Sequence, residues 1–309
     1  MKILLLGANG QVGFELQRAL APLGELLPAT RGGRLPGGMD CLAADLGDPA
    51  SLARALESTT CNVVVNAAAY TAVDRSEDEA QLAQRVNGAA LSEIGAWAAR
   101  RGALVVHYST DYVFDGQGAC PYREDDAIGP LGVYGRTKLA GEQALSDSGC
   151  DHLILRTAWV YGARGHNFLR TMLRLARERE RLTVVDDQHG APTSSRLIAA
   201  STAAVLTRWL SADRPDRTRY NGTYHLAAAG ETTWCGFARA IVAHAVRTGL
   251  LSRPPEVAAI RTADFPTKAR RPAYSVLDTS KLRERFDLHL PHWQAGLDNT
   301  LAEMMEMQN

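Results

Sequence analysis

The sequence predicts an α/β fold built on a doubly wound parallel sheet, with a second, smaller α/β domain in the C-terminal half. Three observations predict it. The run Ile3 to Leu6 is apolar and uncharged, as in a strand buried on both faces. Closely spaced glycines and an amphipathic stretch follow this run directly. Further short apolar runs then alternate with helical patterns, which favours a parallel sheet over an antiparallel one.

Three glycines, Gly7, Gly10 and Gly13, mark the turn after the first strand. We expect Gly7 to let the chain leave the strand sharply and Gly13 to let the next helix pack close to the sheet. Gly10 has no Cβ, so a pyrophosphate can approach the backbone beside the free N–H groups of the helix N-terminus. A βα turn that binds nothing is the alternative. The strand before the glycines and the helix after them favour dinucleotide binding, in a Rossmann-type sheet.

The remaining elements follow in order along the chain. Strands are expected at 25–29, 41–44, 62–66, 104–107, 153–155, 182–185 and 223–226. Helices are expected at 49–57, 76–101, 134–145, 168–179, 192–210, 233–246, 282–286 and 294–307. Asp48-Pro49 supplies an N-cap and a first-turn proline for one helix, and Ser76 with Glu79 predicts a capping box for another.

Strands and helices alternate less regularly after Thr157, which predicts two domains with an interleaved boundary. The strand at 182–185 is placed so that it can return to the main sheet. We therefore expect a dinucleotide-binding domain at 1–156 plus about 182–212. The substrate domain, for a nucleotide sugar, is then expected at about 157–181 plus 213–309.

Composition narrows the class of partner. Hydrophobic residues make up 46% of the 309 residues, and Lys+Arg and Asp+Glu number 34 each, which argues against a nucleic-acid partner. No apolar run approaches the ~20 residues of a membrane helix, and the first apolar run is too short for a signal peptide. We expect a cytoplasmic protein with buried, reduced thiols. Its cysteines are Cys41, Cys61, Cys120, Cys150 and Cys235.

The strand ends predict where a dinucleotide would lie. Arg31 follows the second strand, where such folds meet the adenine ribose, and with Arg34 nearby it favours the 2′-phosphate of NADP over NAD. A solvated loop arginine is the alternative for Arg31. Asp45 is placed to meet the adenine edge. Small residues that let a cofactor lie against the 62–66 strand follow it at Ala67, Ala68 and Ala69.

A phenol and an ammonium group share one face of the 134–145 helix. Tyr134 and Lys138 are four residues apart, and the cation is expected to lower the phenol pKa from about 10. Thr110, at a strand end, is expected to hydrogen-bond the same substrate oxygen. A carbonyl held by Thr110 and Tyr134 beside a nicotinamide is arranged for hydride and proton transfer. A solvated pair on an exposed helix is the alternative for Tyr134 and Lys138 taken alone.

Taken together, these motifs resemble the extended short-chain dehydrogenase/reductase family over nearly the whole chain. The resemblance is closest to members that reduce the C4 keto group of dTDP-4-dehydro-β-L-rhamnose with NADPH or NADH, the last step of dTDP-L-rhamnose synthesis. The stretches that carry it are GANGQVGFEL (7–16), NAAAYTAVDRSE (66–77), STDYVFDG (109–116), YGRTKLAGE (134–142), LRTAWVYG (155–162), DDQHGAPT (186–193) and RRPAYSVLD (270–278).

The resemblance implies roles for single residues. Tyr134 would donate the proton, and Lys138 would bind the nicotinamide ribose and tune Tyr134. Thr110 and Asp111 would touch the sugar, and Trp159 would pack on it. Asp111 capping a turn and Trp159 belonging to the core are the alternatives. The implied cofactor contacts are Gly10, Gln11, Val12, Asp45, Leu46, Ala67, Ala68 and Ala69.

Other positions fit the family less completely. Asn87 would help to hold a proton-relay water, as an asparagine does in relatives. Some members dimerise around a metal ion held by two glutamates; Glu15 fits the first, but Arg196 stands at the second. A homodimer bridged by Mg²⁺ is therefore in doubt, while a homodimer as such stays open. Arg270 and Arg271 suit a nucleotide diphosphate or a surface loop equally well. Structural roles are favoured for His107, His166, His189 and His225, which lack metal-ligand spacing.

Two competing functions stand beside an NAD(P)H-dependent oxidoreductase acting on a dTDP-sugar. The first is a nucleotide-sugar 4,6-dehydratase or epimerase of the same fold. Dehydratases of this family typically carry Thr-Asp-Glu where this chain has Thr110-Asp111-Tyr112, so the acid for elimination is missing. The second is a non-catalytic NADP-binding regulatory subunit, which has no need of the Tyr134–Lys138 pair. We expect a reductase that prefers NADPH and has neither a nucleic-acid nor a membrane partner.

Overall fold

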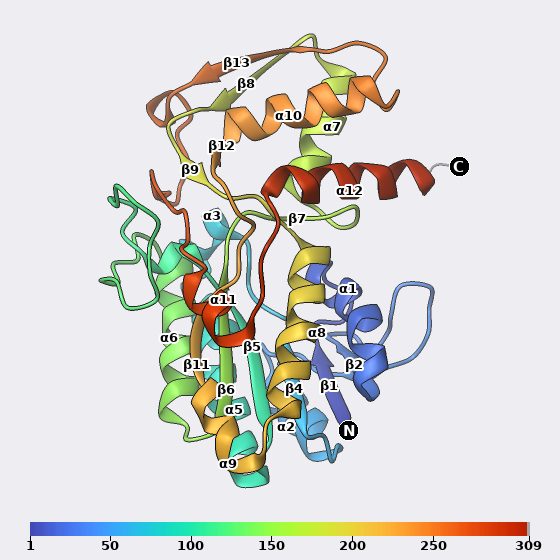
Figure 1. Cartoon of the computed structure of the whole chain (residues 1–309), viewed down its shortest axis with the longest axis vertical. Coiled ribbons are helices and arrows are strands. Elements are labelled where there is room, and N and C mark those ends of the chain that lie inside the picture. The colour runs from blue at the N-terminus through green and yellow to red at the C-terminus, as the bar shows by residue number, and fades with distance from the viewer. Residues whose placement is uncertain (308–309) are drawn as a thin grey trace.

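A seven-stranded parallel sheet forms the lower half of the molecule (Figure 1). The computed structural model describes residues 1–307, apart from the side chains of residues 214 and 215. The strand order is β11-β6-β5-β4-β1-β2-β3, and every neighbouring pair is parallel, which confirms the doubly wound α/β prediction. The strands are β1 (Lys2–Leu6), β2 (Glu25–Thr30), β3 (Leu42–Ala43), β4 (Val63–Asn66), β5 (Leu104–Thr110), β6 (Asp151–Thr157) and β11 (Gly222–His225).

Helices cover both faces of this sheet because its central strands are apolar on both. In β1, Ile3 and Leu5 pack into one core cluster, while Leu4 and Leu6 pack into the cluster on the opposite face. The first face is covered by α1 (Gln11–Leu20), α8 (Ser195–Ser211) and α11 (Ser280–Phe286). The second is covered by α2 (Pro49–Glu57), α5 (Ala90–Arg101) and α6 (Val133–Asp147).

A smaller helical region lies above the sheet, with its own apolar core (Figure 1). Leu173, Ile241 and Leu297 come from three different helices and meet in it, each at most 2% exposed. The helices are α7 (Phe168–Glu178), α10 (Trp234–Arg247) and α12 (Trp293–Glu306). Short strands complete the region: β7 (Val160–Tyr161) with β10 (Thr193–Ser194), β9 (His189–Gly190) with β12 (Thr232–Thr233), and β8 (Arg181–Val185) with β13 (Glu256–Ile260).

Two strand placements differ from the sequence-based expectation. The strand at 182–185 does not return to the main sheet: as β8 it pairs with β13, because Leu182 and Val184 are buried in the core of the helical region. Conversely, the strand expected at 223–226 is part of the main sheet, since β11 lies beside β6. A local apolar pattern shows that a segment is a strand, but it does not say which sheet the strand joins.

The long helix expected at 76–101 is broken into several pieces. It consists of α3 (Val73–Ser76), α4 (Ala80–Gln84), a π turn (Arg85–Ala89) and α5. The capping box was wrong: Ser76 ends α3 and donates to the carbonyl of Val73, while Glu79 accepts from the hydroxyl of Tyr70 at 2.6 Å. The N-cap at Asp48 is confirmed, since its carboxylate accepts from the N–H of Ala50 at 2.9 Å.

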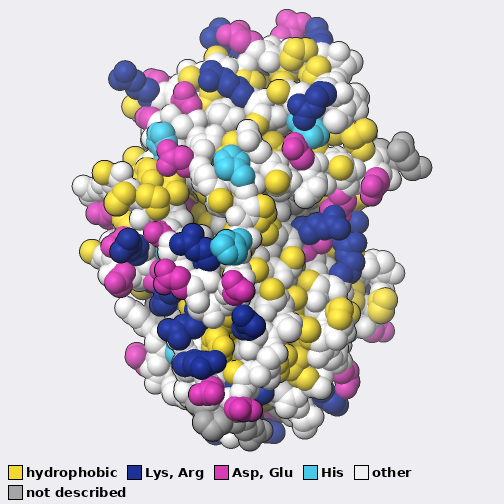
Figure 2. Space-filling view, in the orientation of Figure 1, with side chains coloured by type: hydrophobic (Ala, Val, Ile, Leu, Met, Phe, Trp, Pro, Cys, Tyr) yellow, Lys and Arg dark blue, Asp and Glu magenta, His cyan; other side chains and the backbone are white. Residues whose placement is uncertain are grey.

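The cysteines are less uniformly buried than expected. All five are free thiols, and Cys61, Cys150 and Cys235 are buried, but Cys41 is half-buried and Cys120 is exposed. Acidic and basic side chains are interspersed on the face shown in Figure 2, in keeping with the zero formal charge. Within residues 1–307, no helix combines the length and the apolar character that crossing a bilayer requires.

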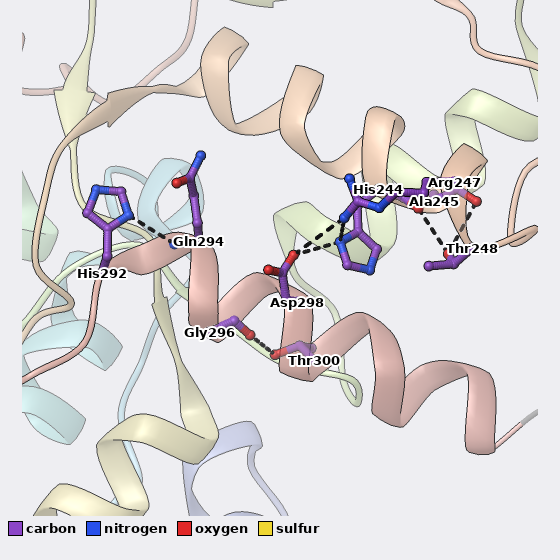
Figure 3. A network of polar contacts seen from close by, with 9 residues as sticks. All are labelled: His244, Ala245, Arg247, Thr248, His292, Gln294, Gly296, Asp298 and Thr300. Atoms are coloured by element: carbon purple, nitrogen blue, oxygen red, sulfur yellow. Dashed lines mark hydrogen bonds and ion pairs between the residues drawn. The ribbon is translucent and has the colours of Figure 1, made fainter.

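A polar network ties α12 to α10 on the outside of the helical region (Figure 3). Asp298 Oδ1 lies 2.6 Å from His244 Nδ1 and 3.9 Å from Arg247 Nη2. The side chain of Asp298 is 57% exposed, so water screens these contacts. The network fastens one helix to another at the surface, whereas the interaction between their apolar faces lies in the core beneath it.

Candidate active site

The carboxyl ends of four neighbouring strands meet at one edge of the main sheet. Leu6 at the end of β1 pairs with Asn66 at the end of β4, and Thr110 at the end of β5 pairs with Thr157 at the end of β6. The loops that follow these strands therefore lie side by side, as the sequence predicted. In open parallel sheets, ligands bind outside this edge.

The glycine turn after β1 has the expected geometry. Gly7 has a φ of 76°, which favours glycine, and a Cβ there would lie 2.7 Å from the backbone nitrogen of Ala68. A Cβ at Gly13 would collide with the carbonyl oxygen of Gly7, so α1 packs on the turn only because Gly13 has no side chain. Gly10 caps α1 without a side-chain hydrogen bond, and no acidic residue lies in its first turn. This helix N-terminus fits a pyrophosphate.

Neighbouring residues close the glycine turn on two sides. Gln11 donates to the carbonyl of His166 at 3.2 Å and accepts from Asn167 at 2.8 Å, so it links the turn to the loop before α7. Val12 packs against the apolar core beside α1. On the other side, the N–H groups of Ala67 and Ala68 donate to the carbonyl of Leu6 and to Asn66 Oδ1, and Ala69 follows half-buried.

The predicted adenine-side residues lie beyond β2 and β3. Arg31 is exposed, and its side chain has no hydrogen bond or ion pair with another residue in 1–307, so its guanidinium group is available to an anion. Arg34 instead lies 3.4 Å from Asp40. Asp45 Oδ1 accepts from the N–H of Gly47 at 2.8 Å. The Leu46 side chain is only 4% exposed and belongs to the core.

The phenol of Tyr134 is a weaker acid than the sequence suggested. Burial raises the pKa of Tyr134 to about 12; the hydroxyl of Thr110 opposes this shift and the charge of Asp111 adds to it. The expectation that Lys138 lowers this pKa was wrong. Removal of the phenolate from water outweighs the neighbouring groups in this structure, so Tyr134 keeps its proton at neutral pH.

The amine of Lys138 is turned toward β5. It is 1% exposed, and Nζ lies 2.6 Å from the carbonyl oxygen of Tyr108 and 3.1 Å from Nε2 of His107. Burial lowers the pKa of Lys138 to about 7, and the charge of Glu142 opposes this shift. The Tyr134–Lys138 pair is therefore enclosed by the protein, and the alternative of a solvated surface pair is wrong.

Thr110 and Asp111 form a buried polar step directly after β5. Thr110 Oγ1 donates to Asp111 Oδ1 at 3.0 Å and accepts from the N–H of Tyr112 at 3.2 Å, so Thr110 caps the turn. Asp111 is 2% exposed and its Oδ2 has no hydrogen-bond partner within the described part of the chain. Burial raises the pKa of Asp111 to about 6. An unpartnered buried carboxylate oxygen fits a ligand hydroxyl.

Trp159 connects the sheet edge to the helical region. Its φ of 47° is rare for a large side chain. The indole stacks flat on Trp234 at the start of α10, with ring centroids 3.5 Å apart and planes 3° apart. A Cβ at Gly190 would collide with the same indole. The role of Trp234 escaped sequence reasoning, because nothing near position 234 in the sequence indicates that a second indole packs on it.

Asn87 lies in the π turn and holds two elements together. Its Oδ1 accepts from the N–H of Tyr70, and its Nδ2 donates to the carbonyl of Tyr70 and to Thr137 Oγ1, both at 3.1 Å. Both amide hydrogens are therefore used, so the side chain can offer a water only a lone pair of Oδ1. Asn87 fixes the loop after β4 to the catalytic helix α6.

Of the residues predicted to meet a diphosphate or a metal ion, Arg271 and Glu15 have partners within the chain, while Arg270 is exposed. Arg271 pairs with Asp74, with one contact of 2.7 Å. Glu15 lies 3.1 Å from Arg18, and a second carboxylate, Glu303, lies within 4 Å of both Arg18 and Arg196. Two guanidinium groups thus neutralise the carboxylates, and residues 1–307 contain no cluster of His, Cys, Asp or Glu suited to a metal ion. The arrangement does not fit Mg²⁺.

Fold and site together define an NAD(P)-dependent oxidoreductase of the Rossmann type. The model of one protein family, described as the RmlD substrate binding domain, matches residues 1–306. This chain belongs to that family. It is 49% identical over 307 residues to the dTDP-4-dehydrorhamnose reductase of Burkholderia thailandensis, covering 99% of each chain. It is 45% identical over 304 residues to that of Salmonella typhimurium, covering 98% of each.

A solved structure supports the cofactor class. The dTDP-4-dehydrorhamnose reductase of Bacillus anthracis in complex with NADP superposes with a TM-score of 0.83 at 31% identity, over 98% of this chain and 99% of that one. More distant structures, such as MoeE5 with UDP-glucose and NAD at 20% identity and a TM-score of 0.78, share the fold.

Proposed function

We propose that this protein reduces the C4 keto group of dTDP-4-dehydro-β-L-rhamnose to give dTDP-β-L-rhamnose, with NADPH preferred over NADH. The observation that carries the proposal is the group of buried Thr110, Asp111 and Lys138 with half-buried Tyr134, at the same sheet edge as the glycine turn. It stands at the sheet edge of a chain that is 49% identical to a relative with this name.

The chain's own residues supply the acid and the orientation. A bound reduced nicotinamide supplies the hydride. Tyr134, which burial keeps protonated with a pKa of about 12, gives its proton to the carbonyl oxygen. Thr110 hydrogen-bonds the same oxygen and holds Asp111, whose free Oδ2 accepts from a sugar hydroxyl. Trp159 packs against the sugar with Trp234 behind it.

The glycine turn and the strand ends would hold the cofactor. The free N–H groups at the start of α1 would bind the pyrophosphate, and Arg31 would pair with the 2′-phosphate of NADP. Lys138, which lies 3.1 Å from His107, would also hydrogen-bond the nicotinamide ribose. The other residues proposed to contact the cofactor, through backbone or side chain, are Gly7, Gly10, Gln11, Val12, Gly13, Asp45, Leu46, Ala67, Ala68 and Ala69.

Two domains are proposed, with bounds revised by the sheet pairing. The dinucleotide-binding part includes 1–156, α8 and β11, because α8 packs on α1 and β11 extends the main sheet. The substrate part consists of α7, β8, α10, β13 and α12. We place the protein in the cytoplasm. If two copies pair through the face that carries Glu15, they do so without a metal ion, because Arg18 and Arg196 already neutralise the carboxylates.

The test is NADPH oxidation by the purified protein with dTDP-4-dehydrorhamnose, run beside an NADH reaction. We expect turnover with net loss of NADPH. In Arg31→Ala, the KM for NADPH should rise while that for NADH stays nearly unchanged, because only NADPH carries the 2′-phosphate. Conversion without net cofactor use would indicate an epimerase, and NADP binding without turnover would indicate a regulatory subunit. An equal effect of Arg31→Ala on both cofactors would contradict the role of Arg31.

A further inference from the structure

Three buried polar side chains form a continuous path from β4 through β5 to α6. Asn66 Nδ2 lies 3.1 Å from His107 Nδ1, and His107 Nε2 lies 3.1 Å from Lys138 Nζ. None of the three is more than 1% exposed. Asn66 and His107 are direct neighbours in the register of the sheet. The mechanism above uses only Lys138 and leaves the other two without a role.

The backbone fixes the orientation of the Asn66 amide. Its Oδ1 accepts from the N–H of Ala68 at 3.1 Å, so its Nδ2, which can only donate, faces His107. Nδ1 of His107 must therefore accept and carries no proton. Burial alone keeps the pKa of the fully buried His107 well below its ordinary value, so the ring is neutral. A neutral ring then carries its proton on Nε2, the nitrogen that faces Lys138.

This tautomer sets a condition on Lys138. An ammonium group has donors and no acceptor, so it cannot accept the N–H of His107. A neutral amine has a lone pair, and it can accept from His107 while donating to the carbonyl oxygen of Tyr108 at 2.6 Å. The contact between His107 and Lys138 is therefore a hydrogen bond only when Lys138 has released its proton.

The charged groups on α6 and β6 do not reverse this preference. Glu142, one turn after Lys138, favours the ammonium, but Arg156 on β6 binds its carboxylate at 3.0 and 2.7 Å. Tyr134, one turn before Lys138, is a neutral phenol at neutral pH, since burial raises its pKa to about 12. On β5, burial also raises the pKa of the Tyr108 phenol, which stays protonated.

The other elements packed against α6 present charges that have partners within the chain, apart from the unpartnered Oδ2 of Asp111. On the turn after β5, the Oδ1 of Asp111 accepts from Thr110. The π turn and α5 contribute Arg85 and Glu93, which pair with each other at 2.7 Å. Near α3 and α4, Asp74 pairs with Arg271, Arg75 with Glu79 and Asp78 with Lys268, while the carboxylate of Glu77 accepts from the N–H of Val133.

We propose that Asn66 and His107 are positioning residues that hold a fixed imidazole N–H against Lys138 and so make Lys138 a proton carrier instead of a permanent cation. Burial acts in the same direction, because it lowers the pKa of Lys138 to about 7. A group that titrates near neutral pH exchanges protons most effectively there.

The proton balance follows from this role, which rests on the proposed reductase function. When hydride adds to the carbonyl carbon, the O–H proton of Tyr134 goes to the carbonyl oxygen. The ammonium of Lys138 returns a proton to the phenolate and becomes the neutral amine that His107 stabilises. Lys138 then takes a proton from solvent. One ketone, one hydride and one proton give one alcohol.

The cofactor-free protein itself provides the test, because the chain has only four lysines, Lys2, Lys138, Lys268 and Lys281. In protein carrying [ε-¹³C]lysine, the Cε signals are followed by NMR from pH 5 to 11, and Lys138 is assigned by its loss in Lys138→Arg. The signals of the three surface lysines serve as the internal reference. Lys138 should titrate near neutral pH.

Replacing the imidazole then tests the positioning role. His107→Phe keeps a ring but removes the N–H, and should raise the Lys138 midpoint by at least about one pH unit, a tenfold change in proton affinity. The alkaline limb of the pH profile of kcat should move upward with it. His225→Phe is the matched control: His225 is equally buried at the end of β11 but does not contact Lys138, so the midpoint should not move. If His107→Phe does not fold, Asn66→Ala replaces it as the test variant. This substitution removes the amide that keeps the imidazole proton on Nε2 of His107, so it should also raise the Lys138 midpoint.

Two results would overturn the proposal. One is a wild-type Lys138 that titrates with the surface lysines. The other is a Lys138 midpoint that is the same in the wild type and in the folded variants of residue 107 or 66. Because the titration needs neither cofactor nor substrate, its failure is separate from a failure of the reductase assay.

Discussion

The sheet edge buries ionisable side chains, whereas the helical region carries them at its surface. At the sheet edge, Lys138, Asp111, Arg156 and Glu142 are each no more than 4% exposed. In the helical region the ion pairs lie in water: the Arg181 and Glu256 side chains are 64% and 63% exposed, and the pairs of Arg174 with Glu178 and of Arg253 with Glu180 are likewise at the surface.

The difference shows that ionisable groups are buried at the candidate active site and not in the helical region. An ionisable group taken out of water destabilises the fold unless it is paired and hydrogen-bonded. In the helical region the apolar core carries the stability, and its surface charges contribute little. At the sheet edge an unpartnered carboxylate oxygen and a lowered amine pKa occur together, as is common at functional sites, and both groups have a role in the proposed reaction. Four substitutions test this difference.

The largest effect is expected at the phenol. Tyr134→Phe removes the proton donor and keeps the ring, so turnover should fall by roughly 10²–10⁴-fold. NADPH binding should be nearly unchanged, which a fluorescence titration of the variant checks. Near-normal turnover would remove Tyr134 from the mechanism.

The next largest is expected at the buried ion pair behind Lys138. Arg156→Met leaves the Glu142 carboxylate buried without its partner and should lower the free energy of unfolding by about 3–5 kcal/mol. Urea unfolding followed by circular dichroism measures this. The double variant Arg156→Met with Glu142→Leu is the control and should recover most of the loss. If the single variant is as stable as the wild type, the pair is not buried as described.

A smaller effect, of opposite sign, is expected at Asp111. Burial raises its pKa in the fold to about 6, above about 3.9 in the unfolded chain. Its contribution to stability is therefore full below the unfolded pKa and is lost as pH rises through the folded pKa. At pH 7, Asp111→Asn should stabilise the cofactor-free protein by about 2 kcal/mol while raising the KM for the sugar nucleotide. Urea unfolding of the wild type and of Asp111→Asn at pH 4 and pH 7 checks the sign. A variant that is less stable than the wild type at pH 7 would contradict it.

The smallest effect is expected in the helical region. Arg174→Ala removes one partner of an exposed pair on α7, and should change the free energy of unfolding by less than about 0.5 kcal/mol and leave turnover unchanged. Parallel urea unfolding of this variant and Arg156→Met compares the two regions directly. A loss as large as that of Arg156→Met would remove the contrast.

Local patterns predicted the parts of the molecule that local sequence determines. The glycine turn, the apolar strands and the N-cap at Asp48 depend on residues close in the chain, and each was found as expected. The partner sheet of β8 depends on β13, which is far away in the sequence, and no local signal could give it. The break of the 76–101 helix arises in the same way, because Glu79 is engaged by Tyr70 from the preceding loop.

For the candidate site too, the sequence predicted the local arrangement but not the contacts between distant segments. The spacing of Tyr134 and Lys138 placed them on one helix face, but the direction of their pKa shifts depends on burial by distant elements. His107 was read as structural, although a polar residue between Val106 and Tyr108 in a buried strand was a usable signal. Its contact with Lys138 required the three-dimensional pairing of β4, β5 and α6.

The most direct test of the proposed C4 reduction follows the hydride from the cofactor to the sugar. The purified protein is given dTDP-4-dehydrorhamnose and NADPH deuterated at nicotinamide C4, and the product is examined by NMR. We expect one deuterium at C4 of the rhamnose ring and NADP⁺ in equal amount. A product with no deuterium at C4, or with exchange from solvent at other ring carbons only, would contradict it.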